Sequence, residues 1–149
     1  MQLDVRGPRF AAALTTIVLI VILVTGNGWL ALAQATVFAL GATHARWAPY
    51  GALYRTLVQP RLGPPTQFEP AEPFRFAQGV GFAFLAAASV GYLSGATVVG
   101  VVATSFALMA AFLNAAFGLC LGCEVYLLLR RTFAPRAGGA TAASEIRQP

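Results

Sequence analysis

The chain has 149 residues, of which 58% are hydrophobic and only 10% are charged, and its net charge is +5. Soluble domains carry about 25% charged residues, so this composition excludes an ordinary soluble protein and indicates an integral membrane protein. All 10 basic residues are arginines that lie singly or in pairs near the ends of apolar runs, without forming a basic stripe. We therefore expect a lipid bilayer as partner and no nucleic acid.

The first two apolar runs cover residues 10–25 and 29–45. Between them lies Gly26-Asn27-Gly28, and glycine and asparagine both tolerate the positive φ angles of tight turns. Trp29 then begins the second run in the position of an interfacial anchor. Each run is slightly short of the roughly 20 residues of a spanning helix. The pattern predicts a helical hairpin.

An alternative for this region is a secretory signal peptide over residues 1–33. Arg6 and Arg9 precede an apolar stretch, and Ala31-Leu32-Ala33 resembles a cleavage site. The glycine-rich turn, with apolar residues on both sides of Ala31-Leu32-Ala33, favours the hairpin.

Residues 46–75 differ abruptly in composition, since they contain six prolines, and we expect them to form a loop outside the bilayer. Tyr50, Leu53, Tyr54 and Leu57 recur at helical spacing within it. This spacing predicts a short amphipathic turn that lies on the lipid headgroups.

The third and fourth apolar runs cover residues 76–93 and 96–129. The fourth is longer than the hydrocarbon core, so its helix either projects from the membrane or bends near Gly118 and Gly122. Small residues repeat every fourth position in both runs, which predicts close helix packing and also allows a homo-oligomer. These residues are Gly79, Ala83, Ala87 and Gly91 in the third run and Ala103, Ala107, Ala111 and Ala115 in the fourth.

The predicted fold is therefore an all-α polytopic membrane protein with four transmembrane helices arranged as two hairpins. The N-terminal residues 1–9, the loop 46–75 and a disordered tail 134–149 then share one side of the membrane. All ten arginines fall on that side, and the positive-inside rule makes it cytoplasmic. We expect a bacterial cytoplasmic (inner) membrane with both termini in the cytoplasm.

The two cysteines, Cys120 and Cys123, lie close to the arginine-rich side. On a continuous helix their Cα atoms would be about 5 Å apart, a distance that a disulfide can bridge. They are candidates for a redox pair, with Glu124 as a candidate proton acceptor. The negative charge of Glu124 would also disfavour a thiolate. A Cys-x-x-Cys motif alone is weak, because cysteine is also a common packing residue.

Polar residues near the inner ends of the third and fourth runs predict a cluster around the thiols. Its members are Gln78, Asn114, His44 and Arg75. Such amides more often join helices by hydrogen bonds than bind ligands. The sequence predicts no cofactor, and it predicts no metal because a second ligand pair is absent.

Several segments together resemble a bacterial integral-membrane family, the domain of unknown function 4395 family. The segments are Asp4-Val5-Arg6-Gly7-Pro8-Arg9-Phe10, Arg61-Leu62-Gly63-Pro64-Pro65, Arg75-Phe76-Ala77-Gln78 and Ala111-Phe112-Leu113-Asn114-Ala115, together with Gly118 to Tyr126. The resemblance covers nearly the whole chain, with Val5 in place of a proline and Gln59 in place of an arginine. It implies a compact membrane protein without an established activity, encoded near thioredoxin-like and sulfurtransferase genes.

Two main hypotheses follow. In the first, the thiols cycle between dithiol and disulfide and exchange with a thioredoxin-like or sulfurtransferase protein. In the second, the protein is a non-catalytic scaffold or assembly factor in which the cysteines only pack. A small transporter is a third hypothesis, although no charged residue lies at mid-membrane to support it. No motif in the sequence establishes an enzyme.

Overall fold

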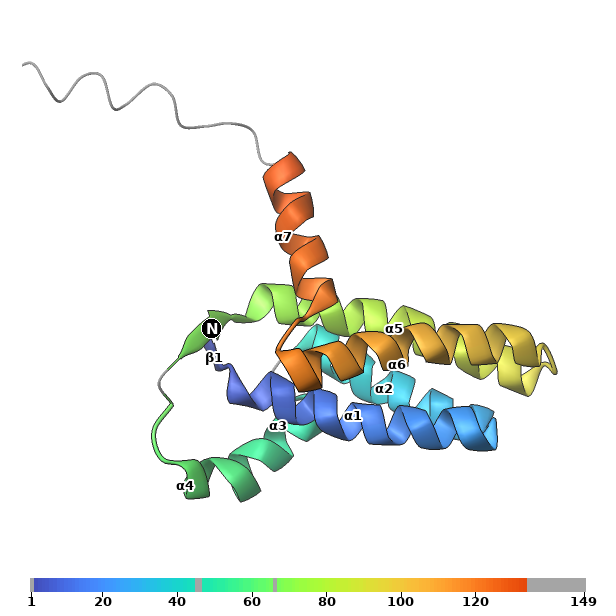
Figure 1. Ribbon diagram of the computed structural model, residues 1–149, viewed down its shortest axis with the longest axis horizontal. Helices are drawn as coiled ribbons and strands as arrows, with labels where there is room; N and C mark the ends of the chain where they lie inside the picture. Colours follow the sequence, from blue (N-terminus) through green and yellow to red (C-terminus); the bar gives the residue numbers. More distant parts are fainter. Residues whose placement is uncertain (1, 45–46, 66, 134–149) are drawn as a thin grey trace, which may run out of the picture.

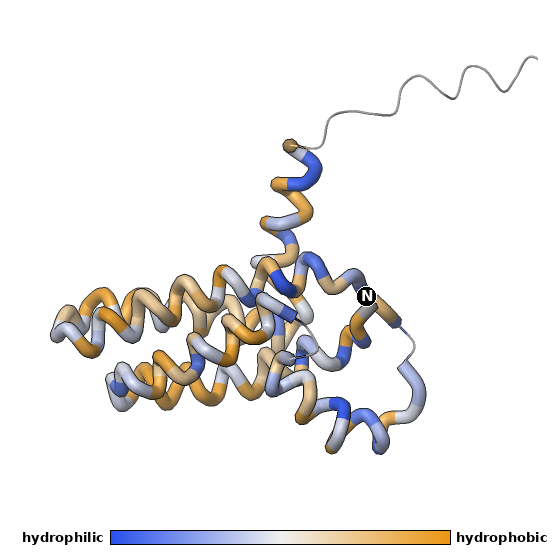
Figure 2. Tube along the Cα trace, turned by 180° about the vertical axis from the view of Figure 1, so that it is seen from behind, coloured by the Kyte–Doolittle hydropathy of each residue, from blue (hydrophilic) through white to orange (hydrophobic). Residues whose placement is uncertain are grey.

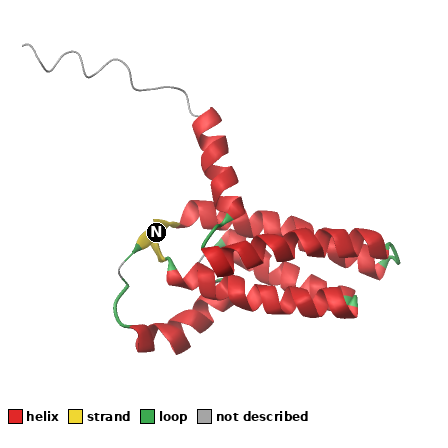
Figure 3. Ribbon diagram, viewed as in Figure 1, coloured by secondary structure: helices red, strands yellow, loops and turns green. Residues whose placement is uncertain are grey.

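The computed structural model describes residues 2–44, 47–65 and 67–133. Four long helices lie side by side and make up most of it (Figures 1 and 3). In chain order the elements are β1 (Gln2–Asp4), α1 (Arg6–Thr25), α2 (Gly28–Thr43), α3 (Pro49–Leu53), the π-helical turn η2 (Tyr54–Val58), α4 (Gln59–Leu62), β2 (Phe68–Pro70), α5 (Ala71–Leu93), α6 (Thr97–Phe117) and α7 (Leu121–Phe133). The all-α prediction is confirmed apart from a small ribbon in which β1 pairs antiparallel with β2.

Short turns at one end of the bundle connect α1 to α2 and α5 to α6. Gly26 ends α1 in the left-handed conformation at φ 62°, which suits glycine, and the Asn27 side chain accepts hydrogen bonds from the first amides of α2. The predicted turn at Gly26-Asn27-Gly28 is thus present. Across the bundle, α2 packs chiefly on α5, α5 also contacts α6, and α6 contacts α1.

Small residues allow these helices to approach closely. The core consists of Leu19, Ile22, Leu85 and five alanines from α2, α5 and α6. At Gly91 of α5, an added Cβ would lie 2.6 Å from the backbone nitrogen of Gly100 in α6. Such backbone contact is typical of helices that associate in lipid, where packing and not hydrophobic burial holds them together.

The outer faces of the bundle are apolar. Val24 and Val98 are 80% and 76% exposed, and hydrophobic residues follow the long helices over most of their length (Figure 2). Within the described residues, three helices, α1, α5 and α6, are long and apolar enough to span a membrane. The region of the second predicted span forms the apolar helix α2, which has only 16 residues and is shorter than these three.

Every charged residue in the described part of the chain lies toward the end of the bundle that is opposite the short turns. We call this the charged end. It contains β1, β2, the helical segment from α3 to α4, and α7 (Figure 1). The predicted C-terminal tail, 134–149, lies outside the described residues, as do Arg46, Arg136 and Arg147.

The loop segment is integrated more closely than the sequence predicts. Tyr54 is only 3% exposed and packs on α1, where its ring lies 5.8 Å from that of Phe10. Tyr50 donates a hydrogen bond of 2.7 Å to Gln34 in α2. Of the four side chains that define the predicted amphipathic turn, only those of Leu53 and Leu57 are exposed. The segment therefore joins α1 and α2, which contact each other only lightly.

The two small-residue stripes differ in their surroundings. In α6, Ala103 and Ala107 are buried in the core. In α5, Ala83 and Ala87 are exposed, and an added Cβ at Gly79 would meet no atom within 4 Å. The face of α5 that packs inside the bundle instead includes Leu85, Ala88 and Ser89. Within the expected α5 stripe, Gly91 is the residue whose backbone lies against α6.

Candidate functional site

The fourth apolar run is divided in two. Gly118 takes the left-handed conformation at φ 69° directly after α6. Its amide donates to the carbonyl of Asn114, and the amide of Leu119 donates to the carbonyl of Leu113. A left-handed glycine whose amide bonds four residues back is the αL motif, which ends a helix and satisfies its last carbonyls. Of the two sequence alternatives, projection or bending, the structure shows a bend, and α7 leaves the bundle sideways (Figure 1).

The bend changes the setting of the two cysteines. Cys120 and Cys123 form a disulfide, and their Cα atoms are 5.2 Å apart. They do not share one continuous helix, as the sequence geometry assumed, because Cys120 directly precedes α7. The backbone amide of Cys123 donates a hydrogen bond to the sulfur of Cys120, with 3.4 Å between nitrogen and sulfur. Cys120 therefore occupies the N-cap position of α7.

This placement has an electrostatic consequence for the reduced form. A helix N-terminus carries partial positive charge and free amides, and both stabilise a thiolate. Sequence reasoning considered the charges of Glu124 and of Arg130 and Arg131 but not this effect, because it placed Cys120 in the middle of a helix. Glu124 lies in the first turn of α7, where an acidic residue also favours the helix.

Two contacts hold the start of α7 against α5. An added Cβ at Gly122 would lie 2.6 Å from the Cβ of Ala77 and 2.7 Å from its Cα, so the two backbones are in close approach. One turn further along, the rings of Tyr126 and Phe76 lie 5.6 Å apart. The disulfide is therefore fixed on the bundle although no residue of α7 is fully buried.

Cys120 also lines a pocket of about 290 Å³ among α1, α5, α6 and the start of α7. We call it the helix pocket. Most of its lining is apolar, and its main apolar residues are Ala12, Phe84, Phe106, Ala107, Ala111 and Val125. The structure thus places three predicted site residues, Gln78, Asn114 and Cys120, around one cavity.

The remaining predicted site residues lie elsewhere. Arg75 donates a 2.9 Å hydrogen bond from Nε to the carbonyl of Ala42 near the end of α2. His44 follows the same helix, and its ring lies 5.8 Å from that of Trp47. Neither side chain lines the helix pocket, and Cys123 and Glu124 do not line it either. The sequence predicts only how deep each residue lies in the membrane. Residues at the same depth can still lie on different sides of the bundle.

Sequence reasoning missed Arg9. Its guanidinium lies against the end of α6, with Cζ 3.6 Å from where a Cβ of Gly118 would be. A cation at this position is favourable because the helix C-terminus carries partial negative charge. Arg9 and Gly118 are more than 100 residues apart in the sequence, so no local pattern could have revealed this contact.

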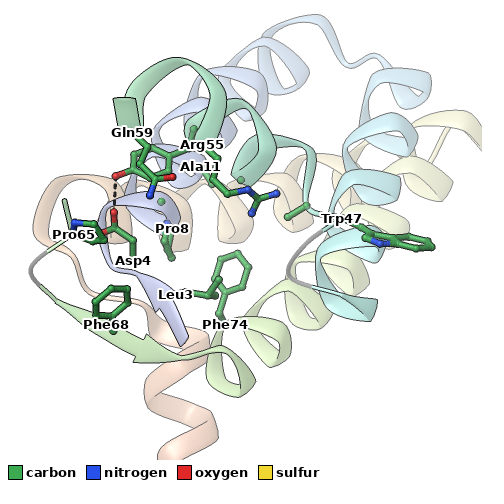
Figure 4. A pocket seen from close by; sticks show the side chains of 14 residues that line it. Leu3, Asp4, Pro8, Ala11, Trp47, Arg55, Gln59, Pro65, Phe68 and Phe74 are labelled. Atoms are coloured by element: carbon green, nitrogen blue, oxygen red, sulfur yellow. Dashed lines mark hydrogen bonds between the residues drawn. The ribbon is translucent and has the colours of Figure 1, made fainter. Parts of the chain in front are cut away.

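A second pocket of about 670 Å³ lies at the charged end, and we call it the loop pocket. Arg55 and Gln59 approach it from one side and Leu3, Phe68 and Phe74 from the other (Figure 4). Tyr54 also lines it and donates a 2.9 Å hydrogen bond to Asp4 Oδ2, shown as a dashed line. Burial raises the pKa of Tyr54, and the hydrogen bond to Asp4 raises it further.

Metal ligation has no candidate among residues 2–44, 47–65 and 67–133, since no three His, Cys, Asp or Glu side chains gather there.

These features define a class, a helical protein with apolar membrane-length helices and a disulfide at its charged end. The chain belongs to the family described as Domain of unknown function (DUF4395), whose model matches residues 3–131. This match confirms the family resemblance drawn from the sequence motifs. Comparisons with curated proteins and with solved structures find no match.

Proposed function

We propose that this protein is a thiol–disulfide exchange protein of the bacterial cytoplasmic membrane, with its charged end in the cytoplasm. The observation that carries the proposal is the Cys120–Cys123 disulfide at the N-terminus of α7. A pair in this setting combines a bridgeable geometry with a stabilised thiolate, and these are the two requirements of reversible exchange. The arginines at the same end support the orientation through the positive-inside rule.

The partner in this proposal is a soluble thioredoxin-like protein or a sulfurtransferase, as the family resemblance implies. Its thiolate attacks the sulfur of Cys123, because Cys120 faces the helix pocket and Cys123 does not. The disulfide breaks, a mixed disulfide forms and Cys120 leaves as the thiolate that the helix N-terminus stabilises. The second thiol of a thioredoxin-like partner then attacks the mixed disulfide and releases Cys123. In total, two electrons and two protons pass from the partner dithiol to this protein.

The test uses a bacterial thioredoxin whose resolving cysteine is replaced by serine, so that a mixed disulfide cannot be released. Oxidised wild-type protein in lipid nanodiscs should form a covalent complex with it, and mass spectrometry should locate the bond at Cys123. Cys120→Ser and Cys123→Ser should each abolish the complex, because neither variant has an internal disulfide for the thioredoxin to attack.

A covalent complex that persists equally in both variants would refute a specific exchange site. Failure of the oxidised wild-type protein to react at all would refute the proposed function. That second result would favour the scaffold hypothesis, which the exposed Ala83 and Ala87 of α5 support as a surface for self-association.

A further inference from the structure

The helix pocket adjoins the apolar outer surface of the bundle as well as the disulfide. Phe84 and Phe106 line it, and both also count among the exposed apolar residues of the outer surface. Their rings stack with centroids 6.1 Å apart. A lipid-soluble molecule at this surface would therefore lie next to a pocket that Cys120 also lines.

Two amide side chains in this pocket have no partner. Gln78 and Asn114 line it, and neither side chain forms a hydrogen bond within the part of the chain that the structure describes. The Gln78 side chain rests on Gly41 of α2, where an added Cβ would lie 3.1 Å from Cδ. Both side chains are half-buried, and their amide groups are suited to donate hydrogen bonds to carbonyl oxygens of a ligand.

We propose that the helix pocket binds the ring of a membrane quinone and that this quinone oxidises the Cys120–Cys123 dithiol. The inference rests on the proposed function and supplies the electron acceptor that it lacks. Quinones are established acceptors for electrons from protein dithiols in membranes. A pocket of about 290 Å³ suits one substituted ring, while the isoprenoid tail extends into lipid past Phe84 and Phe106. A lipid acyl chain could not accept hydrogen bonds from the two amides and could not oxidise the thiols.

The reaction balances without another reactant. The S–H bonds of Cys120 and Cys123 break, an S–S bond forms, and two electrons pass to the quinone. The two protons end on the quinone oxygens, which become the hydroxyls of a quinol. With the exchange step, the net reaction converts a partner dithiol and a quinone into a partner disulfide and a quinol.

The experiment uses decylubiquinone, whose fully substituted ring prevents thiols from adding to it. Reduced protein in nanodiscs is mixed with it, and quinone loss is followed by absorbance while free thiols are counted with a maleimide. The expected stoichiometry is one quinone consumed for two thiols lost. Ala111→Leu fills the pocket and should slow the reaction about tenfold or more, corresponding to about 1.4 kcal/mol in the barrier. Asn114→Leu keeps the volume but removes the donor, and it should raise the quinone concentration for half-maximal rate.

The matched control is Ala116→Leu, the same change at an exposed position of α6 that does not line the pocket. Its rate should stay within about twofold of wild type, a difference below about 0.5 kcal/mol. Exchange of the disulfide with the thioredoxin trap should be unchanged in all three variants, which shows that they are folded.

The outcomes separate the two proposals. If wild-type protein exchanges with thioredoxin but does not reduce decylubiquinone, the quinone proposal is wrong and the exchange function stands. Equal rates in Ala111→Leu, Asn114→Leu and Ala116→Leu would likewise overturn it, because oxidation would then occur outside the pocket. If thioredoxin exchange also fails, both proposals are wrong.

Discussion

At the scale of single residues, Tyr54 joins the loop segment to the N-terminus. Its hydroxyl donates to Asp4, whose other oxygen accepts from the amide of Arg6. Its ring packs on Gly7, where an added Cβ would lie 3.4 Å from the ring. The Tyr54 side chain thus connects three parts of the chain. These are η2, Asp4 at the end of β1, and the first turn of α1.

The raised pKa of Tyr54 predicts how stability depends on pH. The folded protein favours the neutral hydroxyl, so this contribution is fully present below the ordinary tyrosine pKa of 10.0 and is lost as pH rises through the folded value. Tyr54→Phe removes the hydroxyl and should cost about 1–3 kcal/mol at neutral pH. The measurement is the apparent melting temperature of both proteins in detergent, from neutral pH to well above pH 10. The difference between them should shrink at high pH, and parallel curves would contradict this account.

At the scale of secondary-structure elements, the placement of α7 depends on a glycine. Alanine favours helices over glycine by about 1 kcal/mol, so Gly122→Ala would stabilise an isolated α7. In the protein, the new methyl would collide with Ala77, and part of the obstacle is backbone. We therefore expect Gly122→Ala to lower the melting temperature and to slow formation of the disulfide in reduced protein.

Gly79→Ala is the matched control, since Gly79 also lies within a helix but an added Cβ there meets no atom within 4 Å. It should leave the melting temperature unchanged or raise it, and it should not affect the disulfide. A rise of similar size in both variants would show that α7 is not held against α5.

The elements also show which features the sequence could predict. Runs of apolar residues separated by turn residues located α1, α2, α5 and α6, because these signals are local. The bend at Gly118 was only one of two alternatives, because apolar residues continue on both sides of it. A hydropathy pattern does not show that a glycine adopts the left-handed conformation. Pairing of β1 with β2 joins three-residue segments more than 60 positions apart. Ala83 and Ala87 of the α5 stripe are exposed in this structure, and a row of small residues does not show which helix face is covered.

For the candidate site, the sequence supplied residue types and depth but not direction around the bundle. Gln78, Asn114 and Cys120, which the sequence grouped by depth, line one pocket. His44 and Arg75 share the depth, yet they lie at the end of α2 and outside the pocket. Which helices are neighbours is decided by packing between distant segments, and one sequence contains no direct signal of it.

At the scale of the whole molecule, charge is distributed on one end only. Charged side chains avoid the bilayer core because removing them from water is costly, and arginines are retained on the cytoplasmic side. The end with the short turns carries no charge in the described chain. If the bundle spans the membrane, the disulfide and the turn at Ser94 must therefore face opposite compartments.

This asymmetry predicts the result of labelling with a membrane-impermeant maleimide. In inverted vesicles, Cys120 and Cys123 should react only after reduction, because they form a disulfide. In right-side-out vesicles they should remain unlabelled even after reduction. Ser94→Cys, introduced into a protein with serine at both native cysteines, provides the matched control, since Ser94 is exposed at the opposite end. It should react only in right-side-out vesicles. Labelling of Ser94→Cys and the native pair from the same side would rule out a bundle that crosses the membrane with its charged end inside.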